Sequence, residues 1–336
     1  MTEPHPQTAT DLPYVVAVGA SFGGVTALLD VVGSLPAGFP AIVAVVLHIG
    51  SQQSILPELL ARRGPLPARH AREGDLPIPG TIYVAPPDHH LLLAPDAIHL
   101  SRGPRENHAR PAVDPLLRSV ALGWRERAIG VVLTGELDDG TAGLEAVKAC
   151  GGTAVVQDPS EAAAPSMPAS ALAHVPIDHC LPLAQIGPLL ARLVMRDPPL
   201  PAGEPPERLV REQAYFNGNQ MDDLTAIATP SQLTCPECGG SLSELKDTRP
   251  LRYRCHTGHA YTALSLENAQ AEVASHQLQG SLRSLKEREM LLRRLAVVAH
   301  KIGDEAQAQA GRLQADRLHE QIERLKGLIQ EDLRSA

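Results

Sequence analysis

The sequence lacks the features of a membrane-spanning protein and of a nucleic-acid-binding protein. No stretch reaches the roughly 20 consecutive apolar residues that cross a bilayer, and the longest apolar runs have the length of a strand. Positive charge is not in excess, since 38 acidic residues outnumber 30 basic ones and the net charge is -8. Because phosphate-rich partners attract positive fields, we expect neither membrane insertion nor a nucleic-acid partner.

A secretory signal is also missing. Residues 1–13 carry proline, threonine and acidic residues where a signal peptide has a basic start and an apolar run. We expect these residues to form a disordered leader of a cytoplasmic protein. Of five cysteines, Cys150 and Cys180 stand alone, whereas Cys235, Cys238 and Cys255 crowd one segment beside histidines. That spacing favours metal binding over disulfides, in a reducing compartment.

Residues 14–195 alternate between apolar runs of strand length and helical segments. The runs include YVVAVGA, AIVAVVLHI, AIGVVLTG and TAVVQD. Near-continuous Val/Ile/Leu runs are typical of parallel strands covered on both faces, so the alternation predicts a doubly wound, mainly parallel α/β sheet. The shorter runs TIYVAPP, HHLLLAP and AIHLS predict a hairpin or an edge extension of that sheet.

The rest of the chain changes composition twice. The Pro-rich text RDPPLPAGEPPE opens residues 196–230, which we expect to be a stiff linker with a short helix. A Cys/His module follows at 231–262. Residues 263–336 predict two long helices, because apolar residues recur at steps of three and four. Gly303-Asp304 separates them, since Gly ends a helix and Asp caps the next.

The first strand-like run ends in a motif typical of a nucleophilic serine. Residues 19–24, GASFGG, lie between a strand and a helix, which is the context of a G-x-S-x-G nucleophile elbow. Small neighbours let the backbone bend sharply, so that the Ser21 hydroxyl projects from the sheet edge. Amides at the start of the following helix, Phe22 N–H first, can bind an oxyanion.

A phosphate-binding loop of a dinucleotide fold is the alternative for the same segment, because it has the same order of strand, glycines and helix. The spacing is not G-x-G-x-x-G, and the Gly-Lys-Ser/Thr of a P-loop is absent. The next strand ends in His48, where a ribose-binding fold has an acidic residue. These differences favour the serine elbow.

Two further strand ends supply candidates for a general base and its partner. His48 ends one run, and Asp138 and Asp139 follow another. The carboxyl ends of parallel strands meet at one edge of the sheet, where His48 can accept the proton of Ser21 and an aspartate can fix its tautomer. Spacing does not choose between the two aspartates, and either can instead serve as a turn residue before Gly140.

These motifs resemble, in order, the CheB-type methylesterase domain of chemotaxis. The family pattern has G-A-S-x-G-G, a strand ending in the catalytic His, Y-[IV]-A-P, R-P-S-V-D, L-T-G-M-G-x-D-G-A-x-G and G-M-P-x-x-A. Here the matching segments are VGASFGG, VVLHIG, IYVAPPDHH, ARPAVD, LTGELDDGTAG and SMPASA, over roughly residues 15–190. The resemblance implies that fold, with Ser21 as nucleophile, His48 as base and Asp139 as its aspartate. It places the oxyanion at the amides of Phe22 and Glu136.

The resemblance implies a hydrolase in chemotaxis signal transduction. The expected reaction is hydrolysis of glutamate γ-methyl esters on a chemoreceptor-like methylated protein, through a glutamyl-enzyme and without a catalytic cofactor. Glutamine deamidation is a further activity of the family. Two alternatives stay open: an esterase or amidase with another substrate, and a catalytically silent signalling scaffold.

Three departures from the family pattern bear on this interpretation. Glu136-Leu137 replaces the family's Met-Gly, which alters the expected oxyanion hole. The His-x-Pro that commonly follows the base is missing, with Ile49-Gly50 in its place. Because only about a dozen residues precede the first strand, we expect no receiver domain and no control by aspartyl phosphorylation within the chain.

Two local patterns near the middle of the domain have simpler interpretations. A basic run forms either a solvated face or a patch that steers an acidic receptor helix towards the site; its members are Arg102, Arg105, His108 and Arg110. Asp114-Pro115 is typical of a helix cap followed by a first-turn proline.

The Cys/His module predicts a structural zinc site. Two knuckles, CPEC and CHTGH, are separated by an insert of hairpin length, and tetrahedral zinc favours such paired ligands. We expect a small zinc-ribbon-like fold in which four side chains leave no open position on the metal; they are Cys235, Cys238, Cys255 and His259, with His256 as the alternative fourth ligand. The helical tail is expected to pack on itself, self-associate or bind a partner such as a separate response regulator.

Overall fold

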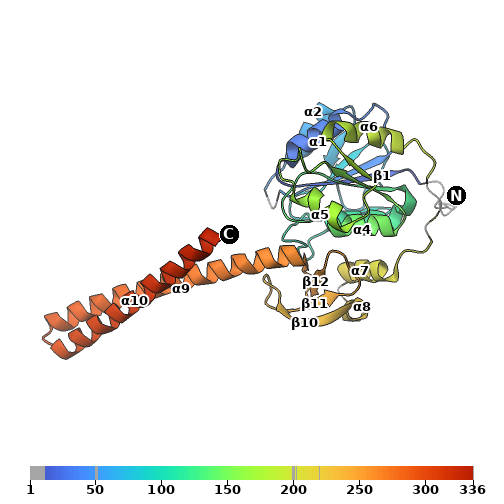
Figure 1. The fold of residues 1–336 in the computed structure, drawn as a ribbon. Helices are drawn as coiled ribbons and strands as arrows, with labels where there is room; N and C mark the ends of the chain where they lie inside the picture. The colour runs from blue at the N-terminus through green and yellow to red at the C-terminus, as the bar shows by residue number, and fades with distance from the viewer. Residues whose placement is uncertain (1–11, 50–51, 199–200, 202, 219, 336) are drawn as a thin grey trace. The chain divides into compact units, whose positions relative to one another are not determined.

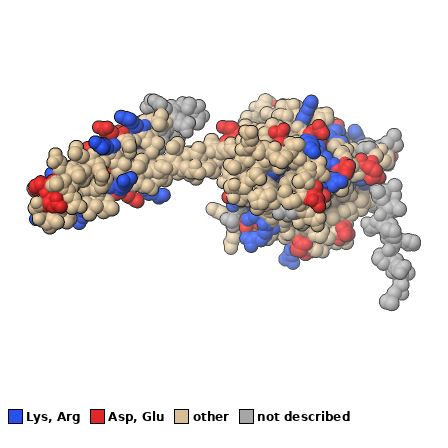
Figure 2. All heavy atoms as spheres, turned by 90° about the horizontal axis from the view of Figure 1, so that it is seen from below, with Lys and Arg blue, Asp and Glu red and all other residues tan. Residues whose placement is uncertain are grey.

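The computed structural model describes residues 12–49, 52–198, 201, 203–218 and 220–335. Most of the expected disordered leader, residues 1–11, lies outside this range, as does Gly50. The chain forms two compact units, residues 1–266 and 267–336. In the view of Figure 2, basic and acidic side chains are interspersed on each unit, as expected for a sequence with similar numbers of both.

The first unit is built on a seven-stranded sheet whose neighbouring strands all pair in parallel. The strand order is β3-β4-β2-β1-β7-β8-β9. Their bounds are Val15–Ala20 for β1, Ile42–Leu47 for β2, Ala68–His70 for β3, Ile82–Val84 for β4, Ala128–Val132 for β7, Thr153–Gln157 for β8 and His179–Leu181 for β9. The predicted parallel α/β sheet is therefore confirmed.

Helices cover both faces of this sheet (Figure 1). The helices α1, α2 and α6 pack on one face, and α3, α4 and α5 on the other. Along β1 alternate residues enter the two cores, which explains why the strand is apolar throughout. The bounds are Gly24–Gly33 for α1, Leu56–Arg63 for α2, Val113–Trp124 for α3, Thr141–Ala149 for α4, Ser166–His174 for α5 and Leu183–Leu193 for α6, with a 3-10 turn at Arg125–Arg127.

A separate antiparallel hairpin follows β4. It consists of β5 (His90–Leu93) and β6 (Ile98–Ser101), which pair with each other rather than with the main sheet. The Leu93 amide donates to Ser119 Oγ of α3 at 3.1 Å, so the hairpin docks on that helix. Of the three short runs, HHLLLAP and AIHLS thus form a hairpin, whereas TIYVAPP forms β4, which extends the main sheet beyond β2.

The C-terminal part of the first unit is a four-stranded antiparallel sheet preceded by two helices. The helices are α7 (Glu207–Gly218) and α8 (Met221–Ile227). The strands, in sheet order, are β10 (Ala228–Thr234), β11 (Ser241–Leu245), β12 (Arg252–Cys255) and β13 (Ala260–Thr262). Residues 207–227 were expected to be mostly linker. Within this range α7 and α8 are helical because the Pro-rich composition ends at Pro206 and the apolar residues Leu209, Tyr215 and Leu224 are buried.

A cluster of buried charges joins this C-terminal part to the α/β domain. Two of its members, Glu106 and Arg118, come from the α/β domain. The others are Glu212 of α7 and Arg252 and Arg254 of β12. All five side chains are at most 4% exposed. Arg118 donates to both glutamates, at 2.9 and 3.3 Å. Arg254 also contacts both, at 2.8 and 2.9 Å. The two parts therefore share an ion-pair network.

The second unit is a helical hairpin. It contains most of α9 (Ala263–Lys301) and all of α10 (Glu305–Ser335). Gly303, at φ 83°, ends the first helix, and Asp304 Oδ1 accepts the Gln307 amide at 3.0 Å at the start of the second. The predicted long C-terminal helices are confirmed. Among the described residues, none of the helices is both long and apolar enough to cross a membrane.

Candidate active site

Ser21 lies at the sharp turn between β1 and α1. Its amide donates to the Thr134 carbonyl at 2.9 Å, and its carbonyl accepts the Gly24 amide at 2.9 Å. Gly23 has φ 75°, and a Cβ there would lie 2.6 Å from the side chain of Ala163. The turn therefore requires glycine for both its backbone conformation and its space. This local geometry presents Ser21 at the carboxyl edge of the sheet.

His48 follows β2, the strand next to β1. Its amide donates to the Ala20 carbonyl at 3.2 Å, which continues the ladder between the strands and brings the ring beside the serine. His48 Nδ1 lies 3.1 Å from Ser21 Oγ, and Nε2 lies 2.8 Å from Asp139 Oδ2. With the proton on Nε2, the ring donates to the carboxylate and leaves Nδ1 free to accept the serine proton.

Asp139 is buried between β7 and α4 and is held by several donors. Its oxygens accept the amides of Val113 at 2.7 Å and Gly140 at 3.0 Å, and Asn107 Nδ2 at 3.1 Å. Burial alone would raise the pKa of this carboxyl, but the hydrogen bond and charge of His48 and the bonds from Val113 and Asn107 lower it. The aspartate beside the imidazole is therefore ionised and fixed in orientation.

Asp138 points elsewhere, which resolves an alternative that spacing left open. Its Oδ1 accepts the Thr262 hydroxyl at 2.7 Å, so this side chain faces the end of β13. Burial raises the pKa of Asp138, and the bond from Thr262 partly offsets that effect. The structure thus brings Ser21, His48 and Asp139 together and leaves Asp138 outside the chain of hydrogen bonds.

Asp114 does not cap its own helix, contrary to our expectation. Its Oδ1 accepts the amides of Gly140 at 3.0 Å and Gly143 at 2.6 Å, so it satisfies the first turn of α4 instead. Its Oδ2 accepts Asn107 Nδ2 at 2.9 Å. Burial and the nearby Asp139 carboxylate raise the pKa of Asp114 well above its usual range. No sequence motif pointed to Asn107, which donates to both of these carboxyl groups.

The two residues expected to form the oxyanion hole flank the serine. Phe22 follows Ser21 directly. Glu136 lies in the loop after β7, where its exposed side chain lines a pocket that Ser21 and His48 also line. Leu137 has φ 59°, the left-handed conformation that favours glycine. This leucine stands where the family pattern has Gly. The backbone keeps the left-handed conformation suited to glycine, and the leucine side chain makes that conformation strained.

A pocket of about 350 Å³ opens at the hydroxyl of Ser21 and the ring of His48. Arg105, His108 and Arg110 of the basic run line it, together with Asp88. Arg110 and Arg102 both pair with Asp88, at 2.6 Å each, and these bonds lower the pKa of that carboxyl to about 2. The basic run is thus partly neutralised at the pocket rather than a bare positive patch.

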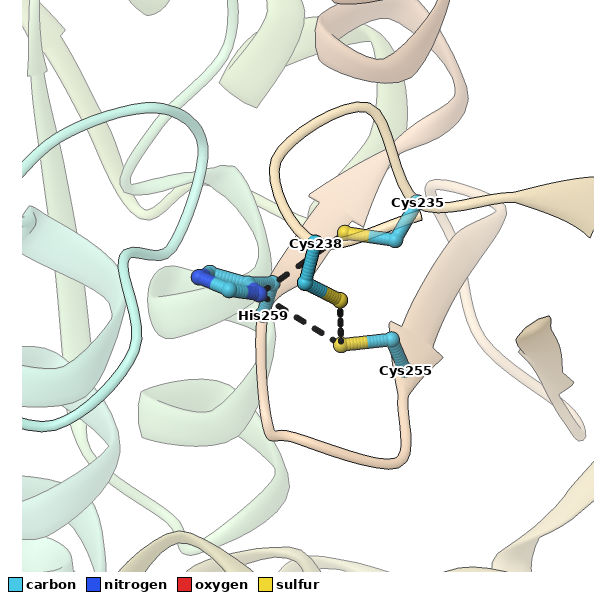
Figure 3. Close-up of side chains that lie close together, drawn as sticks. All are labelled: Cys235, Cys238, Cys255 and His259. Atoms are coloured by element: carbon cyan, nitrogen blue, oxygen red, sulfur yellow. Dashed lines mark hydrogen bonds between the residues drawn. The ribbon is translucent and has the colours of Figure 1, made fainter. Parts of the chain in front are cut away.

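The four predicted metal ligands also converge (Figure 3). Their ligand atoms all lie within 4.8 Å of one another; the residues are Cys235, Cys238, Cys255 and His259. His259 Nδ1 lies 3.7 and 3.5 Å from the sulfurs of Cys235 and Cys255. His256, the alternative ligand, lies outside the cluster, with its ring against Gly240.

Comparisons with known proteins identify the first part of the chain. A family model described as CheB methylesterase matches residues 16–190, which include Ser21, His48 and Asp139. The chain is 38% identical over 198 residues to protein-glutamate methylesterase/protein-glutamine glutaminase 3 of Burkholderia orbicola, covering 58% of each protein. It is 39% identical over 191 residues to the fourth such protein of Anaeromyxobacter dehalogenans, covering 53% of this chain and 51% of the relative.

A solved structure shows the same architecture. The CheB methylesterase catalytic domain of Thermotoga maritima matches with 32% identity and a TM-score of 0.52, over 54% of this chain and 99% of that chain. The chain thus spans a little over half the length of the curated relatives it matches. The Cys/His module lies outside the residues of the family match. On the ordered motifs, the fold and the family match, this chain belongs to the CheB methylesterase family.

Proposed function

We propose that this chain hydrolyses glutamate γ-methyl esters on a chemoreceptor-like protein. The observation that carries the proposal is the continuous hydrogen-bonded chain from Ser21 Oγ through His48 to Asp139, at the mouth of the pocket. The curated relatives are named protein-glutamate methylesterase/protein-glutamine glutaminase. A pocket of about 350 Å³ is at the small end of ligand sites and suits one extended side chain.

The proposed mechanism is acyl transfer. His48 Nδ1 takes the proton of Ser21 Oγ as that oxygen attacks the ester carbonyl carbon. The amides of Phe22 and Glu136 donate to the resulting oxyanion. The carbon–oxygen bond to methoxide breaks, methanol leaves with the proton from His48, and a glutamyl ester remains on Ser21. A water molecule, deprotonated by His48, then attacks this ester and releases glutamate.

Asp139 stays ionised through these steps. Its carboxylate stabilises the imidazolium that forms on His48 and keeps the ring in the productive tautomer. With glutamine as substrate the same groups act, and ammonia leaves in place of methanol. None of these steps requires a metal ion.

The test is methanol release from a methylated receptor by the wild type and by Ser21→Ala. We expect the substitution to lower kcat by at least about a thousandfold, because the nucleophile is lost. Equal rates would refute catalysis by Ser21. If neither protein releases methanol but the wild type hydrolyses an activated ester, the substrate is a different ester; inactivity on both favours a silent scaffold.

We also propose that the cysteine–histidine cluster binds one structural Zn²⁺. Two sulfurs on a tetrahedral zinc lie about 3.8 Å apart, and a sulfur and a nitrogen about 3.5 Å apart. Here the sulfurs of Cys238 and Cys255 are 3.8 Å apart, and His259 Nδ1 is 3.5 Å from the second of them. His259 Nε2 lies 3.3 Å from Glu237 Oε2, the kind of carboxylate that orients a zinc-bound imidazole.

Metal analysis of the purified chain tests this assignment. We expect one zinc per chain, lost in Cys238→Ser and retained in Cys180→Ser, whose cysteine lies outside the cluster. Retention of the metal in Cys238→Ser would contradict the ligand set.

Because free thiols as ligands are typical of a reducing compartment, we infer that the protein works in the cytoplasm.

A further inference from the structure

Residues 105–108 lie between the active-site pocket and the C-terminal sheet. The Asn107 amide donates to the Ala260 carbonyl at 2.8 Å, and the Ala260 amide donates to the Arg105 carbonyl at 3.2 Å. Ala260 opens β13 and directly follows His259, one of the proposed metal ligands. The edge of the metal-binding sheet therefore pairs with a segment that lines the pocket.

The side chain of Asn107 connects the two sides. Its Nδ2 donates to Asp139 Oδ1 at 3.1 Å and to Asp114 Oδ2 at 2.9 Å. Its Oδ1 accepts the Thr262 amide at 3.1 Å and the Ser265 hydroxyl at 3.0 Å. Both donor hydrogens and both acceptor sites of the amide are thus used. A flipped amide would turn its oxygen towards two carboxyl groups, so the network admits one orientation.

The backbone here is held in a conformation that it would not adopt alone. Asn107 and His108 are consecutive non-glycine residues in the left-handed region, with φ 50° and 64°. Asparagine and histidine enter this region more readily than most residues, but two in succession persist only where their surroundings fix them. His108 Nε2 contacts the Ser265 carbonyl at 3.2 Å, and its ring packs edge-on against Tyr261 at 5.3 Å. Residues of β13 and the start of α9 therefore help to fix this segment, together with the two aspartates that accept from Asn107.

We infer that Asn107 is a positioning residue for the triad aspartate and that the metal-binding sheet, with bound Zn²⁺, holds Asn107 in place. The inference rests on the proposed function for its catalytic consequence. Asp139 is hydrogen-bonded both to Asn107 and to the His48 ring that it orients. A displaced Asn107 would therefore change the orientation of His48 through Asp139 alone. On this assignment the catalytic domain is complete only when residues 228–266 are folded around their metal.

The first experiment compares Asn107→Ala and Ser265→Ala with the wild type in the full chain. We expect kcat on an activated ester to fall about 10- to 100-fold in Asn107→Ala, with KM nearly unchanged, because a misplaced base slows chemistry without weakening binding. Ser265→Ala removes one donor to Asn107 Oδ1 and should lower kcat about 2- to 10-fold. The control is Asn217→Ala, a surface asparagine that pairs with Gln213 and should change nothing.

Two readouts do not depend on a substrate. One is the rate at which a fluorophosphonate labels Ser21, and the other is the proton NMR signal of His48 Nε2–H, which reports its bond to Asp139. In Asn107→Ala the labelling rate should fall and the NMR signal should weaken. An unchanged signal and an unchanged labelling rate would overturn the positioning role even if the wild type proves inactive on methyl esters. If Asn107→Ala unfolds globally, the same two readouts on Ser265→Ala, which removes one donor to Asn107 Oδ1, decide the positioning role.

The second experiment removes the metal from the full chain with a chelator and restores it with zinc chloride. We expect the labelling rate of Ser21 to fall on removal and to recover with zinc. Amide hydrogen exchange should quicken at residues 105–114 and stay slow in β1 and β7, whose bonds are internal to the parallel sheet. Unchanged labelling and unchanged exchange at 105–114 after metal loss would overturn the link between the metal and the triad.

Discussion

At the scale of residues, Asp138 and Asp139 show how adjacent identical side chains take different roles. Asp139 turns to His48 and collects amide donors from α3 and from Gly140. Asp138 turns the opposite way and accepts the hydroxyl of Thr262. The difference arises from which neighbouring segment supplies donors, so it belongs to the fold rather than to the local sequence.

The matched pair Asp139→Asn and Asp138→Asn tests this division. We expect Asp139→Asn to lower kcat by about a thousandfold or more, because a neutral amide neither fixes the tautomer of His48 nor stabilises its charged form. Asp138→Asn retains an oxygen for Thr262, and its kcat should stay within about threefold of the wild type. Steady-state kinetics on one ester gives both values, and equal losses in the two variants would contradict the assignment.

Leu137 marks a strained position in the loop beside Ser21. Its φ of 59° costs a non-glycine residue about 1 kcal/mol. In Leu137→Gly the relief of strain opposes the greater chain entropy of glycine. We therefore expect the free energy of unfolding to stay equal or rise by up to about 1 kcal/mol. Leu172→Gly in α5, where glycine only weakens a helix, should lose about 1 kcal/mol. Urea denaturation measures both, and similar losses would show that Leu137 is unstrained.

At the scale of elements, α7 and β12 dock on the α/β domain largely through charge. Glu212 is fully buried and contacts Arg118, Arg252 and Arg254. Removing one partner from such a network leaves buried charge without compensation. We expect Glu212→Gln to lower the free energy of unfolding by about 3–5 kcal/mol. The control Glu207→Gln, on the same helix but exposed, should cost less than about 1 kcal/mol. A small loss in both would mean that the network adds little.

The same network predicts an acid transition. Burial alone would raise the pKa of Glu106, but Arg118 and Arg254 lower it from 4.5 to about 2, and Arg252 and Arg118 hold the pKa of Glu212 well below its usual value. Because the folded-state pKa values are depressed, the network stabilises the fold above about pH 4.5, and this stabilisation is lost as the pH falls towards 2. Thermal unfolding across that range should show a steeper decline for the wild type than for Glu212→Gln.

At the scale of the whole molecule, the order of the apolar runs was enough to predict the parallel sheet and the meeting of Ser21 and His48 at one edge. Parallel strands have a strong local signature, and so do the knuckles of the metal cluster. The interface between the α/β domain and the C-terminal part of the first unit has no local signature, because its partners are far apart in the sequence. Glu106 and Arg254, for example, are 148 residues apart. Asn107 has no local signature for the same reason, because Asp139, Thr262 and Ser265, to which its side chain is hydrogen-bonded, are 32 to 158 residues away in the sequence.

The second unit carries large apolar side chains on its surface. Along α9 the side chains of Met290, Leu291, Leu295, Val297 and Val298 are all more than half exposed, and so is that of Ile302 in the turn after it. The buried positions of the hairpin include small residues such as Ala296, Ala308 and Ala315. Exposed apolar surface of this kind marks an association site. We expect the full chain to self-associate and a chain lacking residues 267–336 to be monomeric, as light scattering can measure. If both chains are monomeric, self-association is refuted and this surface is assigned to a different protein.

The buried ion network also bears on how a shortened chain would behave. A fragment cut where the family similarity stops, near residue 190, would keep Glu106 and Arg118 and lose every charged partner that the rest of the chain supplies. Arg118 and Glu106 would stay paired with each other, but Arg118 would lose Glu212 and Glu106 would lose Arg254. A failure of that fragment to express or to hydrolyse ester would therefore report the loss of this docking surface, and would not test whether Ser21 is a nucleophile.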